Sequence, residues 1–369
     1  DFDPNAPGLA SDEDRYNSAV YGRFEYGSAF KAISAAMALD AGVATEAKQY
    51  DARKPIRVGG HIIRDLHGKK RLLTFSEVVQ YSSNIGMSRV AAELGPERQR
   101  KYLTDLNALD TLPIALKERR APMPPGQWGP SENATVSFGH GIAVTSLHVL
   151  SSFSAVVNGG VYRTPGFLAD GQQRPTRRVF SEETSHTMRR ILRRVVTHGT
   201  ASLADVPGYY PIGKTATADK PSNGGYDRST RLSSFVGAFP GQAPKYAIMV
   251  TLDAPQPTKE TQGLAVAGVN AAPTFARIAS RLGPLFGEAT VREREALRGF
   301  MERPANTIAD AGRQDFNHVL ASGVAADRST VGSRTIAQAP LISGAPVART
   351  QIASTQFAST QIETEQSAP

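Results

Sequence analysis

The chain has 369 residues, enough to bury one large core or two ordinary ones. It is 40% hydrophobic and 21% charged, which is typical of a globular protein, and it has no cysteine, which excludes disulfide bonds and thiolate metal sites. The formal charge of +8 is compatible with an anionic partner. The densest basic stretch, from residue 174 to 194, fits the solvated face of an amphipathic helix, so we expect no nucleic-acid partner.

The first half of the chain alternates helical and turn-rich segments. Phe30, Ile33 and Met37 mark one face of a helix predicted from about residue 28 to 39. Residues 59–75, GGHIIRDLHGKKRLLTF, predict a strand, a turn and a second strand. Two helical segments follow, TFSEVVQY and IGMSRVAAEL, and the stretch SSN separates them. Residues 107–137 are rich in proline and predict loop with short elements.

The second half begins with helices and continues with strands. A buried helix is predicted from residue 146 to 157, inside a stretch too polar and too broken by glycine to span a membrane. The basic helix comes next, with Ser181 as its N-cap and Gly199 as its stop. Three strand-like runs, YYPIGKTATA, RLSSFVGAFP and KYAIMVTLDA, have short connections and predict antiparallel neighbours. A late helix within residues 264–287 would pack on that sheet, which makes the fold class α+β.

The composition changes beyond about residue 303. From residue 336 the chain is mostly Ala, Ser, Thr, Gln and Pro, and residues 350–364 form an imperfect repeat, TQIAS TQFAS TQIET. Such a segment buries too little apolar surface to offset its ordering entropy. We therefore predict a globular domain over residues 1–287, a helical or irregular extension over 288–320, and a disordered low-complexity tail over 321–369.

A serine and a lysine one helical turn apart are the first candidates for catalysis. Ser28 and Lys31 lie at i and i+3 near the start of the first predicted helix, so both side chains share one face. A desolvated lysine loses part of its preference for the ammonium form and can then accept a serine proton. The alternative is structural: a serine cap followed by a lysine that extends its charge to solvent.

Two further short motifs follow in the chain. Ser82 and Asn84 lie at the break between two predicted helices, and Lys214 and Thr215 lie on a predicted strand. The set S-x-x-K, S-D-N and K-T-G is used by serine enzymes that react with penicillin, and the motifs here follow the same order. Each residue also has a structural alternative: Ser82 could cap a helix, Asn84 could be a turn residue, and Thr215 and Thr217 could be ordinary strand residues. We expect His140 to be structural and find no metal-ligand spacing.

Longer stretches narrow the family. The segments DFDPNAPG, FGHGIAVT, NGGVYRTP, GKTATADKPSNGGYDRS, SSFVGAFP and GVNAAPTFARI resemble the transpeptidase domain of class B penicillin-binding proteins. The similarity is greatest to the division-specific, septal peptidoglycan D,D-transpeptidases of Gram-negative bacteria, and it covers about residues 1–287. The resemblance implies the penicillin-binding-protein and serine β-lactamase-like fold, with an antiparallel sheet flanked by helices.

The resemblance also implies a role for each motif residue. Ser28 would attack the D-Ala–D-Ala amide of a peptidoglycan stem peptide, and Lys31 would take its proton. Ser82 would relay a proton to the leaving amine. Asn84 would hold the substrate backbone and help fix Lys31, and Lys214 would supply positive charge near Ser82.

Two threonines would complete the implied site. Thr215 and Thr217 would bind the terminal carboxylate of the substrate, and the backbone N–H groups of Ser28 and Thr217 would form the oxyanion hole. An amine from a neighbouring stem peptide would then accept the acyl group, and β-lactams would acylate Ser28. No cofactor and no metal is implied. In the division machinery the resemblance implies a glycosyltransferase partner.

The sequence departs from the family pattern in two places. Ala216 stands where the family has glycine, and its methyl group could distort the oxyanion hole. The family's cytoplasmic tail, membrane anchor, pedestal domain and first sheet strands precede the stretch that resembles the start of this chain. We therefore expect a fragment of an inner-membrane protein whose catalytic domain is periplasmic, with no membrane span in the fragment itself. Two alternatives remain open: a catalytically impaired scaffold of the division complex, and a D,D-carboxypeptidase or β-lactamase-type hydrolase.

Overall fold

The computed structural model describes residue 3 and residues 5–11, 15–168, 173–222, 225–301 and 349–356. The helices are α1 (Phe30–Asp40), α2 (Phe75–Gln80), α3 (Asn84–Leu94), α4 (Pro96–Asp105), α5 (Pro130–Val136), α6 (Ser146–Val157), α7 (Glu182–His198), α8 (Ala271–Leu285) and α9 (Glu293–Met301). Short 3-10 helices are η1 (Pro7–Leu9), η2 (Gly27–Ala29) and η3 (Ser202–Ala204). The strands are β1 (Gln49–Asp51), β2 (Ile56–Val58), β3 (His61–Ile63), β4 (Leu72–Thr74), β5 (Val161–Arg163), β6 (Thr176–Arg178), β7 (Ile212–Ser222), β8 (Gly225–Phe239), β9 (Tyr246–Asp253) and β10 (Arg349–Gln356).

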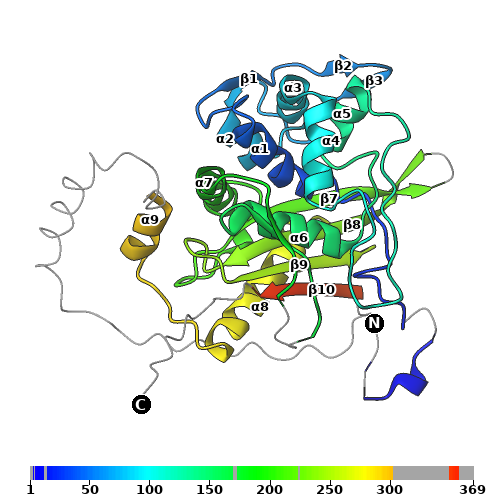
Figure 1. Cartoon of the computed structure of the whole chain (residues 1–369), viewed down its shortest axis with the longest axis vertical. Helices are drawn as coiled ribbons and strands as arrows, with labels where there is room; N and C mark the ends of the chain where they lie inside the picture. Colours follow the sequence, from blue (N-terminus) through cyan, green and yellow to red (C-terminus); the bar gives the residue numbers. More distant parts are fainter. Residues whose placement is uncertain are drawn as a thin grey trace, which may run out of the picture. The chain divides into compact units, whose positions relative to one another are not determined.

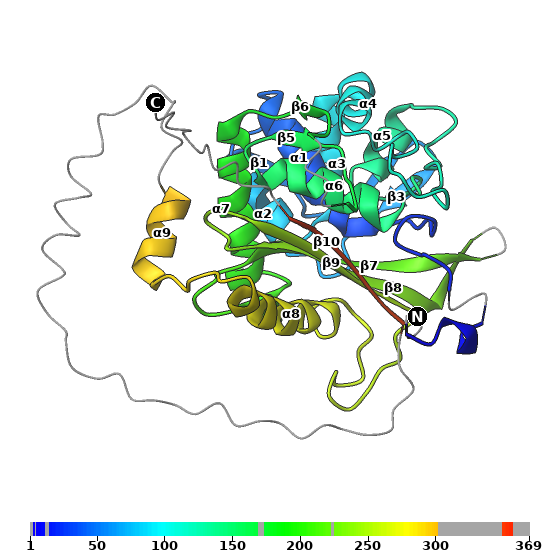
Figure 2. The same ribbon diagram turned by 60° about the horizontal axis from the view of Figure 1, so that its bottom comes forward.

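The main sheet is antiparallel and has the order β10-β9-β8-β7. The three predicted strand runs are confirmed as the consecutive neighbours β7, β8 and β9, joined by short connections. Helix α8 covers one face of this sheet, and α6 and α7 lie on the other (Figures 1 and 2). The predicted α+β class, a sheet flanked by helices, is therefore confirmed.

Two apolar helices form the centre of the core. Every residue of α6 is buried, as the predicted charge-free stretch requires, and so is every residue of α1 from Phe30 to Ala38. The many alanines of α1 let neighbouring elements approach closely, which places its polar Lys31 inside the molecule rather than at its surface. Within the described residues, no helix combines the length and the apolar character needed to cross a membrane.

The strand–turn–strand predicted over residues 59–75 is confirmed in its elements, with β3 and β4 separated by a turn-rich segment. Both strands form, but β3 pairs with β2 and β4 pairs with β1, so the two belong to separate small sheets. The intervening segment does not close a hairpin because Asp65 is bound to the start of α3 through Ser83 and the Ile85 N–H. Helix α4 was not anticipated from the sequence, although Pro96 stands at its first turn, where proline is well tolerated.

The prediction of a disordered tail over residues 321–369 is wrong for one segment. Residues 349–356 form β10, which pairs antiparallel with β9 along its whole length, from Arg349 opposite Asp253 to Gln356 opposite Tyr246. Backbone pairing at an open sheet edge needs no hydrophobic core of its own, so a low-complexity sequence can take part in it. The rest of the predicted tail lies outside the described residues, and α9 lies within the predicted extension 288–320.

Candidate active site

Ser28 and Lys31 lie where the chain enters α1. Ser28 is in the 3-10 turn η2, half-buried, and α1 begins two residues later at Phe30. The Lys31 side chain is fully buried, and its Nζ lies 3.1 Å from Ser28 Oγ. Burial holds the pKa of Lys31 well below its ordinary value of 10.5, and the nearby charge of Lys214 lowers this pKa further. The pair therefore has the contact and the shifted basicity that proton transfer requires.

The turn that carries Ser28 is held by the segment FGHG. Gly27 has φ +51° and donates its N–H to the Gly139 carbonyl at 3.2 Å. A Cβ on Gly139 would lie 2.2 Å from the Gly27 carbonyl oxygen, so only glycine permits this approach. His140, which follows, is half-buried, and desolvation lowers its pKa. His140 thus lies beside the serine turn, and the structural role expected for it stays a prediction.

Ser82 lies between α2 and α3 in an uncommon backbone conformation. Its φ is +59°, a left-handed value that non-glycine residues rarely adopt. The N-cap of α3 is Ser83, whose Oγ accepts the Gly86 N–H at 2.9 Å, so Ser82 is not the helix cap. The Ser82 side chain instead meets both lysines: Lys31 Nζ lies 3.1 Å from Ser82 Oγ, and Lys214 Nζ lies 3.0 Å from it.

Lys214 reaches this point from β7. Its side chain is fully buried, and Nζ donates to the Thr215 carbonyl at 3.1 Å as well as to Ser82. Burial lowers the pKa of Lys214 to about 7. The Nζ of Lys31 also donates to the Ser82 carbonyl at 2.6 Å. The structure thus brings Ser28, Lys31, Ser82 and Lys214 into one continuous set of polar contacts.

The other predicted residues take different positions. Thr217 is half-buried and its Oγ accepts the Ala267 N–H at 3.1 Å, while Thr215 is buried and hydrogen-bonds Thr200 through its hydroxyl. Ala216 is 3% exposed and lies opposite Ser234 of β8. The Cβ that Gly27 lacks would lie 3.4 Å from Ala218 Cβ, which shows that the serine turn packs directly on this part of β7.

Among the described residues, no hydrogen bond joins Asn84 to Lys31. It is the first residue of α3, and its Nδ2 donates to the Arg64 carbonyl at 3.1 Å. Its carbonyl accepts the Ser88 hydroxyl at 2.8 Å inside the helix. Asn84 therefore stands at the rim of the serine–lysine cluster, half-buried, with its amide bound to the segment that follows β3.

Asp65 is a site residue that sequence reasoning missed. Its carboxylate accepts the Ser83 hydroxyl at 2.7 Å and the Ile85 N–H at 2.9 Å, so it fixes the start of α3 from outside the helix. Its negative charge also favours the ammonium form of Lys31 and opposes the lowering of that pKa. The signal available in the sequence was a single aspartate in a turn-rich stretch, which does not distinguish it from other aspartates.

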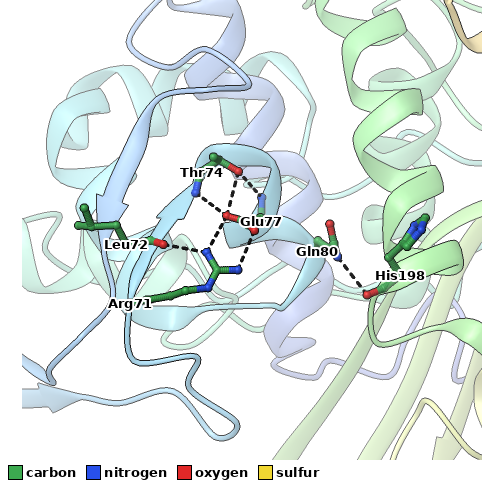
Figure 3. Close-up of polar contacts among 6 residues, drawn as sticks. All are labelled: Arg71, Leu72, Thr74, Glu77, Gln80 and His198. Carbon is green, nitrogen blue, oxygen red and sulfur yellow. Dashed lines mark hydrogen bonds and ion pairs between the residues drawn. The ribbon is translucent and has the colours of Figure 1, made fainter.

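Helix α2 is anchored at both ends, as Figure 3 shows. At its start, Thr74 and Glu77 form a reciprocal capping box, and Arg71 binds the Glu77 carboxylate at 2.7 Å. The hydrogen bond from Arg71 lowers the pKa of Glu77 to about 2. At its end, Gln80 Nε2 donates to the His198 carbonyl at 3.0 Å. Because Ser82 follows two residues after α2, these contacts determine where Ser82 can lie.

A hollow of about 320 Å³ lies elsewhere, beside α4, lined by Arg100, Leu109 and Trp128 among others. It contains none of the predicted catalytic residues. The candidate site is therefore defined by the contacts among its serine and lysine side chains and not by the volume of this hollow.

The model of the penicillin binding protein transpeptidase domain matches residues 1–279 of this chain. The chain belongs to the penicillin-binding protein transpeptidase family. The resemblance stated from the sequence motifs is thereby confirmed.

Relatives and solved structures agree with this family. The chain is 36% identical over 323 residues to a Caulobacter vibrioides protein named "Probable peptidoglycan D,D-transpeptidase FtsI", covering 85% of this chain and 54% of that protein. It is 34% identical over 287 residues to stage V sporulation protein D of Bacillus subtilis, covering 73% and 44%. The transpeptidase domain of Burkholderia pseudomallei penicillin-binding protein 3 is similar with TM-score 0.68 and 28% identity, covering 75% and 83%.

A further similar structure is penicillin-binding protein 3 of Mycobacterium tuberculosis, described as complexed with aztreonam, with TM-score 0.66 and 28% identity over 74% of this chain and 65% of that one. These penicillin-binding transpeptidases share the α+β fold described above. The chain spans about half the length of the curated relatives it matches.

Proposed function

We propose that this domain is a peptidoglycan D,D-transpeptidase that cross-links stem peptides through a serine acyl-enzyme. The observation that carries the proposal is the position of Lys31, fully buried, with its Nζ 3.1 Å from the hydroxyl oxygens of both Ser28 and Ser82. A buried amine with a lowered pKa beside a serine hydroxyl is the arrangement that activates a serine nucleophile at neutral pH.

Acylation follows from these contacts. Neutral Lys31 accepts the Ser28 proton as Ser28 Oγ bonds to the carbonyl carbon of the penultimate D-Ala of the donor peptide. The tetrahedral intermediate collapses when the C–N bond breaks. The departing nitrogen takes its proton from Ser82 Oγ, which Lys31 in turn resupplies, so that D-Ala leaves with a neutral amine. Lys214, bonded to the same oxygen, holds Ser82 in place for this relay.

The second half reverses these steps with a different amine. The amino group of a neighbouring stem peptide attacks the ester carbonyl and forms the new amide bond, while its proton passes through Ser82 and Lys31 back to Ser28 Oγ. A β-lactam reacts as a mimic of the donor: its ring amide opens on Ser28, and the resulting ester persists as long as neither water nor an acceptor amine attacks it. The complexes of a related protein with aztreonam and ampicillin support this expectation.

The remaining predicted residues bind and polarise the substrate. Thr215 and Thr217, on the strand against which the serine turn packs, are proposed to hold the terminal carboxylate of the donor. The backbone N–H groups of Ser28 and Thr217 are proposed as the oxyanion hole, where each donor contributes about 3–4 kcal/mol in acyl-transfer enzymes. Asn84, at the rim of the cluster, is proposed to hold the peptide backbone of the donor.

The setting of the whole protein is also proposed from its relatives. The similarity to proteins named FtsI and PenA supports a role in septal cell-wall synthesis. By the same resemblance, we assign the complete protein to the inner membrane, with this domain in the periplasm and a glycosyltransferase of the division machinery as partner. We retain residues 1–287 as the transpeptidase domain and 288–320 as an extension.

Labelling with a fluorescent penicillin tests the proposal. The full chain and a Ser28→Ala variant are incubated with the probe, digested, and mapped by peptide mass. We expect the label on Ser28, its loss in the alanine variant, and a label that persists for hours. Release within seconds would indicate a hydrolase, and a folded chain that takes no label would refute acyl transfer at Ser28.

A further inference from the structure

The segment that follows α7 joins the end of α2 to β7. Gln80, 3% exposed, donates to the His198 carbonyl at 3.0 Å (Figure 3). A Cβ on Gly199 would lie 2.6 Å from the Gln80 carbonyl oxygen, so a side chain there would separate the two helix ends. Glycine at this position lets residues 198–200 lie against the end of α2. The next residue, Thr200, is thereby held beside β7.

Thr200 contacts one of the two proposed carboxylate-binding threonines. Its Oγ hydrogen-bonds Thr215 Oγ, and the residue is otherwise exposed on the surface. On its other side, a Cβ on Gly268 would lie 2.8 Å from the Thr200 carbonyl oxygen, so the chain before α8 packs tightly against it. The same stretch donates the Ala267 N–H to Thr217 Oγ at 3.1 Å. Both proposed carboxylate-binding hydroxyls therefore have a protein partner.

Thr215 and Thr217 differ in whether their hydroxyl proton is free to bind a ligand. A backbone N–H can only donate, so Thr217 must accept from Ala267, and its own hydroxyl proton remains available to a further acceptor. Thr200 and Thr215 are both hydroxyls, and either can donate to the other. If Thr215 donates, its proton is used within the protein. If Thr200 donates, both Thr215 and Thr217 offer a proton to the ligand. A carboxylate, which can only accept, is bound well by the second arrangement.

We propose that Thr200 is a positioning residue that donates its hydroxyl proton to Thr215 and so directs the Thr215 proton toward the terminal carboxylate of the donor peptide. This inference rests on the proposed transpeptidase function. It assigns Thr200 no contact with the reacting atoms. Its effect is to make the site selective for ligands that carry a negative charge at the position of that carboxylate.

The test compares a charged ligand with its neutral analogue. Second-order rates of Ser28 acylation are measured with benzylpenicillin and with its methyl ester, for the full chain and for Thr200→Val, which has nearly the same shape without the hydroxyl. Because a hydrogen bond to a charged group is at stake, we expect Thr200→Val to slow acylation by benzylpenicillin about tenfold or more. The rate with the ester should change about threefold or less, since the ester gains little from the directed proton.

Matched variants show whether Thr200 acts by directing the Thr215 proton or only by supporting the local structure. Thr200→Ser, which keeps the hydroxyl, should retain the preference for the charged ligand. Thr197→Val makes the same change three residues earlier, at an exposed hydroxyl that bonds the Arg193 carbonyl and His198 Nδ1 but not Thr215, and should leave both rates unchanged. Thr200→Ala repeats the test if the valine variant does not fold, as monitored by circular dichroism.

Each result has one consequence. Equal slowing with both ligands in Thr200→Val, or no slowing with either, would overturn the proton-directing role while leaving the acyltransferase proposal intact. A wild-type chain that is folded yet reacts with neither ligand would overturn the proposed function, and the inference with it.

Discussion

The pH dependence of acylation should reveal two lysines that act in opposite protonation states. Lys31 must be neutral to accept the Ser28 proton, whereas Lys214 is proposed to act as a cation beside Ser82. Both Nζ atoms lie within 3.1 Å of Ser82 Oγ. Two ammonium groups so close in a buried site repel each other strongly, so we expect one proton to be shared by the pair near neutral pH.

The pKa values of Lys31 and Lys214 determine where the acylation rate should rise and where it should fall with pH. The pKa of Lys31 is well below 10.5, through burial and the charge of Lys214, so activity should rise as Lys31 loses its proton far below the ordinary range. The pKa of Lys214 is about 7, through burial. Above that pH the protonated fraction of Lys214 falls about tenfold per pH unit, and acylation should fall with it. The expected profile is a bell with its alkaline limb near pH 7.

The assay is the rate of Ser28 acylation by benzylpenicillin from pH 5 to 9.5, followed by intact mass, with circular dichroism at each pH as the control for folding. The informative variant is Lys214→Arg, because a guanidinium keeps its charge throughout this range. We expect a lower maximum, since arginine is larger, and no alkaline limb. An alkaline limb that stays near pH 7 in the arginine variant would refute the assignment of that limb to Lys214. A wild-type rate that stays low up to pH 8.5 and is still rising at pH 9.5 would refute the lowered pKa of Lys31.

Three substitutions test the support of the site, each measured by urea unfolding and by penicillin labelling. Asp65→Asn removes the charge that holds the start of α3, and should lower the free energy of unfolding by about 1–3 kcal/mol and slow acylation; unchanged values would contradict its role. Gly139→Ala should cost more than about 2 kcal/mol and abolish labelling, because its Cβ would meet a carbonyl oxygen at 2.2 Å. Its control is Gly42→Ala, which has φ +68° but open space, and should cost about 1 kcal/mol. Ala216→Gly should lower stability by roughly 0.5–1 kcal/mol and change acylation about threefold or less; a tenfold gain would mean that the methyl group obstructs the site.

The sequence predicts those parts of the site that depend on local spacing. Ser28 and Lys31 are one turn apart, so their contact follows once the helix is recognised. The stretch SSN predicts a break between two helices, and the structure has α2 end at Gln80 and α3 begin at Asn84. The three strands around Lys214 were predictable from their composition and from the turns between them.

Contacts between residues on different helices, strands and loops could not be predicted from local spacing. Asp65 reaches Ser83 only because its segment leaves β3 and crosses the start of α3 instead of closing a hairpin. Thr200 reaches Thr215 only because Gly199 lets two helix ends touch. Such contacts depend on how packed elements meet, and neither periodicity nor composition encodes that. The same applies to β10, whose position is set by the free edge of β9 rather than by its own sequence.

The buried Lys214 and the strained backbone of Ser82 lower the stability of the fold, so contacts elsewhere in the domain must offset these costs. The pKa of Lys214 is lowered from 10.5 to about 7, so the unfolded chain binds more protons between those values, and stability rises with pH across that interval. Below about pH 7 the cost of burying this amine is present in full. Ser82, at φ +59°, adds backbone strain of about 1–3 kcal/mol. Contacts at some distance offset these costs: the bonds that the Asp65 carboxylate accepts at the start of α3, the bond from Gln80 to His198, and the approach of Gly139 to the serine turn. A reactive serine–lysine cluster therefore persists here because rigid neighbours hold it in place, and not because its own contacts are stabilising.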